Sequence, residues 1–321
     1  MEQRNPLISV VLCTYNRAEL LGDALNSLLA LSLAKANYEI VVVDNASTDE
    51  TSAVVKAFQT QYSSPAIILV SESMQGLGYA RNAGYKQAKG RYVAFIDDDC
   101  QATKDWLRIV LECFEQVQPQ PWSVGGPIIP VYDVLKPAWF KDSYETDTWG
   151  ESPRVLKRRE SFTGCNMAFK KDMLEKYGGF DIRLDMKGEC LALAGETDLY
   201  RRIWLSEGES CVFYYSPQAV MRHRIDPYKM DVLYQLKRAF SAGQESCVMA
   251  QIEPIYRRCL LFVGSIAFLF RYSVLAVLRI RPGRHWQNWA IEDLRPAAYN
   301  VGRLFSYCGI HMVFRQRKKA T

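Results

Sequence analysis

Short apolar runs rich in Val and Ile alternate with longer, helix-like segments throughout the first hundred residues. The apolar runs begin the stretches 7–16, 38–51, 66–70 and 91–96. Between them, 17–31 repeats leucine on one helical face, and 78–90 is a second helical segment that we expect to end at Gly90. Strands that alternate with helices in this way are typical of β-α units on a parallel sheet. The chain is therefore predicted to be an α/β protein with a mostly parallel central sheet.

Polar clusters follow three of the predicted strands. They consist of Thr14, Tyr15, Asn16 and Arg17; of Asp44, Asn45, Ala46 and Ser47; and of Asp97, Asp98 and Asp99. Right-handed crossovers place the carboxyl ends of parallel strands on one edge of a sheet, where open α/β sheets bind ligands. One such cluster alone is often a solvated turn, but three clusters on the same edge indicate a binding site.

The three consecutive aspartates concentrate negative charge at one point. Mg²⁺ and Mn²⁺ prefer oxygen ligands and often keep phosphate oxygens in their remaining positions. A divalent metal held by one or two of these carboxylates could in turn bind a diphosphate. Side chains of the first two clusters could then hold a nucleoside by stacking and hydrogen bonding. This arrangement explains the concentrated charge without requiring a glycine-rich phosphate loop.

Four motifs together resemble the family 2 glycosyltransferases of the GT-A fold. They are SVVLCTYNR, EIVVVDNASTDET, ARNAGYKQAKGRYVAFIDDD and FTGCNMAFKK, and they occur in the family's order and spacing within residues 7 to about 225. The resemblance implies a Rossmann-like GT-A domain that transfers a sugar, with inversion, from a nucleotide-diphospho-sugar donor to an acceptor hydroxyl. It also implies a divalent metal cofactor, Mg²⁺ or Mn²⁺.

The resemblance assigns roles to the clustered residues. Thr14, Tyr15 and Asn16, together with the adjacent Arg17, match positions that hold the nucleotide, and Asp44, Asn45, Arg81, Asp97 and Asp98 match further donor-binding positions. Asp99 is the expected direct metal ligand, with Asp97 as a second candidate. Because Asp99→Asn would also remove repulsion between neighbouring carboxylates, the sequence predicts that the fold tolerates this change.

The resemblance places the catalytic base in Gly195-Glu196-Thr197-Asp198-Leu199. The family carries two acids before x-Asp-Leu; here Glu196 falls on the second, and Gly195 replaces the first. Inversion requires a carboxylate that removes the acceptor's proton, and Glu196 is the candidate for this role. Asp198 is expected to be structural, capping its helix or pairing with Arg201 or Arg202.

His223 is one of three histidines in the chain. A single histidine is most often a structural residue with satisfied hydrogen bonds. However, its position in VMRHRI resembles one from which related enzymes bring a residue toward the metal or the diphosphate. Either His223 or Arg224 could therefore offset the charge of the leaving group.

Charge is distributed unevenly along the chain. The net charge is +5, but the part from Arg257 onward carries twelve Lys and Arg against two acids, so that the preceding part is acidic. This balance disfavours nucleic acid as a partner and favours an anionic membrane surface for the C-terminal region. Residues 259–280 are the most apolar stretch, and Arg271 interrupts it. We expect an interfacial helix there; a buried core helix and a tilted span are the alternatives.

The expected domain organisation follows from these patterns. Residues 1–225 would form the glycosyltransferase domain, with a nucleotide-binding half (1–117) and an acceptor-binding half (118–225) that includes an irregular region at 132–160. Residues 226–321 would form a helical, basic, membrane-associated region, and the protein would act at the cytoplasmic face of the membrane on a saccharide or lipid-linked acceptor. The nine cysteines include no Cys-x-x-Cys pair, which favours free thiols in a reducing compartment.

Three other functions are compatible with parts of the pattern. A dinucleotide-binding dehydrogenase would need a third glycine where GLGYAR has Arg81. A phosphoacceptor domain of the receiver type would explain the aspartates but not the Thr-Tyr-Asn cluster. A catalytically inactive sugar-nucleotide-binding scaffold at the membrane remains the main alternative to an active transferase. No motif specifies the donor sugar or the acceptor.

Overall fold

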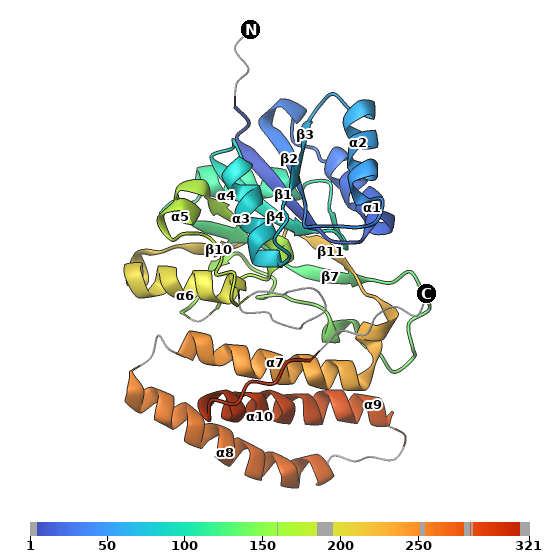
Figure 1. Ribbon diagram of the computed structural model, residues 1–321. Helices are drawn as coiled ribbons and strands as arrows, with labels where there is room; N and C mark the ends of the chain where they lie inside the picture. The colour runs from blue at the N-terminus through green and yellow to red at the C-terminus, as the bar shows by residue number, and fades with distance from the viewer. Residues whose placement is uncertain are drawn as a thin grey trace.

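The computed structural model describes residues 5–158, 160–184, 195–250, 254–278, 283 and 285–314. An α/β part carries the N-terminal two thirds of the chain, and a layer of helices lies beneath it in Figure 1. This division confirms the predicted α/β class and the helical C-terminal extension.

An eight-stranded sheet forms the centre of the α/β part, in the order β3-β2-β1-β4-β9-β6-β10-β8. Its strands are β1 (Ile8–Thr14), β2 (Tyr38–Asp44), β3 (Ala66–Ser71), β4 (Tyr92–Asp97), β6 (Ser123–Gly125), β8 (Arg154–Val155), β9 (Met167–Lys170) and β10 (Phe213–Tyr215). The four predicted strands are all present and pair in parallel. Thr14 is in register with Asp44, and Cys13 with Asp97, so the three polar clusters do share one edge.

A smaller sheet continues from that edge. Its order is β5-β11-β7, with β5 (Cys100–Ala102), β7 (Ile128–Val131) and β11 (Met221–Arg224). His223 of β11 is in register with Cys100, the residue that follows the aspartates. In addition, the Arg224 amide donates to the Asp99 carbonyl over 2.8 Å. This pairing brings β11 to the aspartates from more than a hundred residues away.

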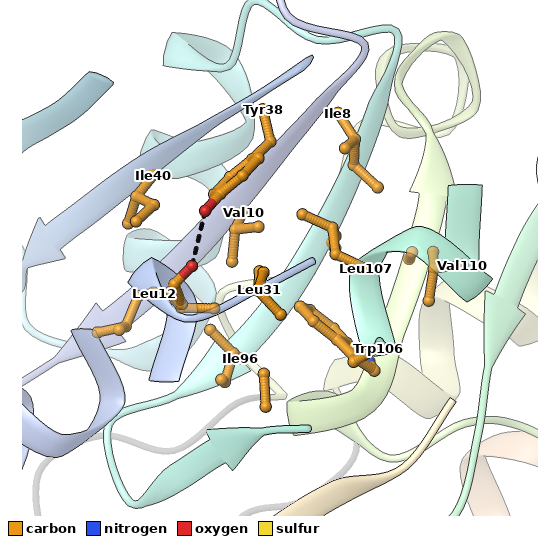
Figure 2. Close-up of a cluster of buried hydrophobic side chains, with 14 of the residues drawn as sticks. Ile8, Val10, Leu12, Leu31, Tyr38, Ile40, Ile96, Trp106, Leu107 and Val110 are labelled. Atoms are coloured by element: carbon orange, nitrogen blue, oxygen red, sulfur yellow. Dashed lines mark hydrogen bonds between the residues drawn. The ribbon is translucent and has the colours of Figure 1, made fainter. Parts of the chain in front are cut away.

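Both faces of the large sheet are covered by helices. The helices are α1 (Ala18–Leu29), α2 (Thr51–Gln61), α3 (Leu77–Gln87), α4 (Trp106–Gln116), α5 (Lys171–Lys176) and α6 (Gly195–Glu207). Apolar residues of α1, α2 and α4 pack on one face, and those of α3, α5 and α6 pack on the other. Figure 2 shows the first cluster, in which Trp106 and Leu107 lie near Val10 of β1. Because the central strands β1, β2 and β4 are buried on both sides, their sequences are mostly apolar and do not alternate with polar residues.

Gly90 has a different role from the one predicted. Helix α3 ends at Gln87, three residues before this glycine. A Cβ atom at Gly90 would lie 2.6 Å from the backbone nitrogen of Ser9. The glycine therefore permits close packing against β1 instead of ending the helix.

The region between β7 and β8 is irregular, as predicted, but it is anchored. It contains a single 3-10 turn, Asp142–Tyr144, and its aromatic side chains Phe140 and Tyr144 are buried. They pack with Ile225, Met230 and Ile291 in a small core of their own. The remaining 3-10 turns are Lys35–Asn37, Gly164–Asn166, Gly208–Ser210 and Pro227–Met230. The irregular region thus joins the α/β part to the C-terminal helices.

The C-terminal layer consists of α7 (Val232–Ala250), α8 (Ile255–Leu278), α9 (Trp286–Trp289), a π-helical turn (Ala290–Leu294) and α10 (Arg295–Tyr307). Helix α10 lies between α7 and α8 (Figure 1). A Cβ atom at Gly243 would lie 1.9 Å from the Tyr299 carbonyl oxygen, and one at Gly302 would lie 2.0 Å from that of Phe240. The two backbones therefore touch at this crossing, and α10 is an integral part of the layer. Each cysteine in the described part of the chain has a free thiol.

Candidate active site

The loops after β1 and β2 are bound together by their own side chains. Asn16 has a positive φ of 50°, and its Oδ1 accepts from the Thr48 amide over 2.7 Å. Asp49 accepts from the amides of Ala18, at the start of α1, and Thr51, at the start of α2, over 3.0 and 3.1 Å. Asp49 thus links the starts of two helices. The first two polar clusters therefore form one rigid unit.

Asp44 and Asn45 are buried within this unit. Asp44 accepts from the Ser47 amide over 3.0 Å and from the Ser52 hydroxyl over 2.6 Å. Asn45 accepts from the Gly76 amide and donates to the Met74 carbonyl, each over 2.7 Å. Both side chains shape the loops, and their predicted contacts with a nucleotide stay predictions. Thr14 is buried beside them, whereas Tyr15 is 36% exposed and presents an aromatic ring at the edge.

The three aspartates meet different cations, which offsets their mutual repulsion. Arg17 Nη1 lies 3.6 Å from Asp98 Oδ1 and 3.1 Å from Asp99 Oδ2. Arg81 Nη2 lies 3.9 Å from Asp97 Oδ1. Arg17 therefore lies beside Asp98 and Asp99, and its predicted contact with a nucleotide stays a prediction.

Asp99 is the most strongly ionised of the three carboxyl groups. Burial raises the pKa of Asp98 to about 7, against the opposing effect of Arg17. Burial likewise raises the pKa of Asp97. Burial acts on Asp99 too, but Lys229, His223 and Arg17 together hold its pKa well below the usual range. Of the three carboxyl groups, Asp99 therefore has the lowest pKa, because cationic side chains already lie beside it.

Asp99 and His223 form a group that fits a divalent metal. His223 Nε2 lies 3.4 Å from Asp99 Oδ1, and ligand atoms of Asp99, His223 and Cys100 all lie within 4.8 Å of one another. A carboxylate and an imidazole suit Mn²⁺, and the carboxylate alone suits Mg²⁺. Burial raises the pKa of the Cys100 thiol well above its ordinary value. The predicted pairing of His223 with Asp99 is therefore sterically feasible, while Asp97 as a ligand stays a prediction.

Glu196 lies in the first turn of α6 and is joined to the aspartates by Arg81. Arg81 Nη1 lies 3.2 Å from Glu196 Oε2, and its side chain is buried. The Gly164 amide donates to Glu196 Oε1 over 3.2 Å. A Cβ atom at Gly164 would lie 2.0 Å from Arg81 Nη2, so this glycine leaves the space that the guanidinium needs. One arginine thus spans Glu196 and Asp97, where the sequence predicted a contact with donor phosphates.

Asp198 is structural, as predicted. It is buried, and its oxygens lie 2.6 Å from Arg201 Nη2 and 2.7 Å from Arg202 Nε. Arg202 also donates to the carbonyls of Tyr177 and Gly179. Asp198 therefore fixes α6 to the turn after α5. The guanidinium of Arg224, the alternative to His223, pairs with Asp133.

Lys229 is the site residue that the sequence did not reveal. Its Nζ lies 3.2 Å from Asp99 Oδ2 and 3.3 Å from His223 Nε2. It belongs to the turn Pro227–Met230, just beyond the predicted end of the transferase domain. No motif surrounds it, and one lysine among 40 basic residues gives no signal of its own.

The chain is similar to several known proteins. Residues 9–178 match the model of the family described as Glycosyl transferase family 2. The glucosyl-dolichyl phosphate glucuronosyltransferase of Haloferax volcanii is 28% identical over 253 residues, which cover 77% of this chain and 78% of the relative. The succinoglycan biosynthesis protein ExoM of Rhizobium meliloti is 26% identical over 241 residues, 74% of this chain and 73% of the relative.

Two solved structures share the fold at low sequence identity. The mannosyltransferase PcManGT from Pyrobaculum calidifontis, in complex with GDP-Man and Mn²⁺, superposes with a TM-score of 0.61 at 19% identity, over 94% of this chain and 88% of its own. Residues 1–349 of TarS from S. aureus, in complex with UDP-GlcNAc, give a TM-score of 0.55 at 15% identity, over 98% and 97% of the two chains. With the family match over more than half of its length, the chain belongs to glycosyl transferase family 2 and is a glycosyltransferase of the GT-A fold.

Proposed function

We propose that this glycosyltransferase moves a sugar, with inversion, from a nucleotide-diphospho-sugar donor to a hydroxyl of a saccharide or lipid-linked acceptor. The observation that carries the proposal is the arrangement of Glu196 and Asp97 on either side of Arg81. It sets a potential base close to the aspartates, while Asp99 lies beside His223. The named relatives, which act in glycan assembly or on dolichyl phosphates, support the acceptor class.

On the donor side, Asp99 and His223 would hold a divalent metal. The metal would offset the charge of the diphosphate and of the departing nucleotide. Tyr15, at the exposed edge of the rigid loop unit, would stack on the base, and the polar atoms of the same unit would fix the ribose. Because Asn16 and Asp49 already order these loops, little conformational entropy is lost when a nucleotide binds.

On the acceptor side, Glu196 would accept the proton of the attacking hydroxyl. The oxygen then bonds to the anomeric carbon as the bond from that carbon to the diphosphate breaks. Arg81 and the Gly164 amide would orient the Glu196 carboxylate toward the acceptor. Gly195 stands here in place of the first acid of the family's pair. Contacts that this acid makes with the acceptor in other family members must therefore be absent here or made by other residues.

Helix α8 has an exposed apolar face, which supports a lipid-linked acceptor. Ile255, Leu260, Val263, Ile266 and Phe270 are between 48% and 79% exposed and recur at helical spacing. The polar Ser265, by contrast, is buried on the opposite side. Arg257 and Arg271 are exposed, and residues 254–291 contain no acid. An apolar face with a basic margin suits the surface of an anionic membrane.

Helix α8 would lie on the membrane rather than cross it. Among the described residues, no helix is both long and apolar enough to be a candidate span. The outer position of α8 in the helical layer leaves its exposed face available (Figure 1). We propose that the enzyme works as a peripheral protein at the cytoplasmic face, where nucleotide-sugars and lipid-linked acceptors meet.

Donor hydrolysis tests the proposed activity. Full-length protein with Mn²⁺ should release UDP, GDP or TDP from one nucleotide-sugar in a panel, and chelation of the metal should stop the release. Measurement of free nucleoside diphosphate over time gives the result. Metal-dependent binding of a donor without hydrolysis, and without transfer to any lipid-linked acceptor, would instead support the inactive scaffold.

Vesicle sedimentation tests the membrane proposal. Leu260→Asp with Phe270→Asp should weaken binding to phosphatidylglycerol-containing vesicles by at least ~10-fold, because each change removes a large apolar group from the interface and adds a negative charge. Leu205→Asp, at an exposed position of α6, is the matched control and should bind as the native protein does. Higher salt should also weaken binding. Equal sedimentation of all three proteins would exclude α8 as the contact.

Truncation is less suitable for this purpose. Removal of the chain after residue 254 would take away α10 together with α8. The backbone of α10 contacts α7 at Gly243 and Gly302, so the loss would expose α7. Point substitutions on α8 leave this packing in place.

A further inference from the structure

A single ammonium group contacts both side chains that a metal would use. Lys229 Nζ lies within hydrogen-bonding distance of Asp99 Oδ2 and of His223 Nε2. Because an ammonium group only donates, a hydrogen bond from Lys229 to His223 Nε2 requires the tautomer in which this nitrogen carries the lone pair. A metal would need that same lone pair.

The backbone of Lys229 is fixed, so any movement must occur in its side chain. The Lys229 amide donates to the Asp226 carbonyl over 2.9 Å, and its carbonyl accepts from Gln235 Nε2 over 2.7 Å. The next residue, Met230, is buried against Phe140 and Tyr144. The flexible four-carbon side chain can still rotate the ammonium away from His223.

Arg17 differs from Lys229, which contacts both Asp99 and His223. It is the other cation beside Asp99, but its second contact is Asp98. Asp99 therefore divides its oxygens, with Oδ2 toward Arg17 and Lys229 and Oδ1 toward His223. A divalent metal on the Oδ1 side can leave Arg17 in place, but it must take the His223 nitrogen from Lys229.

We propose that Lys229 is an exchangeable cation of the active site, which holds Asp99 and His223 before loading and moves to the donor diphosphate when a metal replaces it. The inference rests on the proposed nucleotide-sugar transfer. A divalent metal beside the lysine would repel it, and the diphosphate supplies the nearest new negative charge. In the transfer, the electrons of the broken carbon–oxygen bond leave with the diphosphate, and the acceptor proton goes to Glu196. Lys229 stays protonated and offsets the charge that develops.

Lys229→Met should have opposite effects on the affinities of the protein for Mn²⁺ and for a nucleoside diphosphate. In nucleotide-free, full-length protein, Mn²⁺ should bind at least ~10-fold more tightly than to the native protein, because its competitor is gone. At saturating Mn²⁺, UDP or GDP should bind at least ~10-fold more weakly, because the diphosphate loses a counter-charge. The electron paramagnetic resonance signal of free Mn²⁺ gives the first affinity, and titration calorimetry gives the second.

Controls separate this role from a structural one. Lys104→Met removes the charge of an exposed lysine outside the site and should change neither affinity. Lys229→Gln keeps a hydrogen-bonding group without the charge and should behave like Lys229→Met, with melting temperatures recorded for both variants. Unchanged or weaker Mn²⁺ binding in the two folded Lys229 variants would overturn the proposal, and so would undiminished nucleotide binding. Neither measurement needs turnover, so failure of the proposed transfer activity would be seen separately.

Discussion

Glu196→Gln should lower the transfer rate by at least ~100-fold, the usual contribution of a general base. The amide nearly preserves the shape of the side chain and can still accept from the Gly164 amide, but it cannot take up a proton. Donor and metal affinities should change little, because the contacts of Glu196 are with Arg81 and the Gly164 amide, and the proposed metal ligands are Asp99 and His223. Initial rates of transfer at saturating donor, with donor affinity measured in parallel, give the result.

Asp198→Asn is the matched control on the same helix. It should lower stability by about 1–3 kcal/mol, because two partly buried arginines lose a charged partner. Its rate per folded molecule should stay within a few-fold of the native value. Near-normal turnover in Glu196→Gln would exclude Glu196 as the base, and an inactive but fully stable Asp198→Asn would move the assignment to Asp198.

Asp99→Asn should weaken metal-dependent donor binding by at least ~100-fold. This loss of affinity is larger than the one expected when a group that only hydrogen-bonds to a metal ligand is removed. The amide oxygen is a weaker ligand, and Arg17 and Lys229 are left without their shared carboxylate. Calorimetric titration of donor with and without Mn²⁺ measures the effect. An unchanged dependence on Mn²⁺ in folded Asp99→Asn protein would contradict the assignment.

The same substitution should also lower the stability of the protein, whereas the sequence alone predicts that the fold tolerates it. That prediction rests on the repulsion between three adjacent aspartates, which the change would reduce. In the structure, however, Asp99 pairs with two cations, Arg17 and the buried Lys229, and its pKa is well below the usual range. A depressed folded-state pKa means that the ionised form stabilises the fold above the unfolded-state pKa. A lower melting temperature for Asp99→Asn at neutral pH is therefore expected.

Local sequence patterns were sufficient to predict the framework of the site. Continuous apolar runs identified β1 and its parallel neighbours. The position of the carboxyl ends of those strands on one edge of the sheet follows from topology alone. The Asp198 pairing with Arg201 and Arg202 was predicted because residues three and four apart share a helix face. These features depend on short-range periodicity, which a single sequence contains.

The remaining contacts depend on long-range pairing that no local pattern encodes. His223 reaches Asp99 because β11 pairs with β5 in one register, and Lys229 lies in the turn that succeeds β11. Arg81 bridges Asp97 and Glu196, which is 115 residues further along the chain. A family resemblance can suggest that such residues share a site, but the spacing of residues along the chain cannot show which side chains meet.

Glu145 shows that the catalytic part and the helical layer are not separable pieces. This buried carboxylate accepts from Gln235 and lies 2.8 Å from Arg238 Nη1, both on α7. Ending the chain at residue 225 would leave Glu145 buried without its cation and Asp99 without Lys229. The smallest folded unit that retains these contacts must therefore include α7, and exchange of C-terminal regions between relatives would alter the surroundings of Asp99 together with the helical layer.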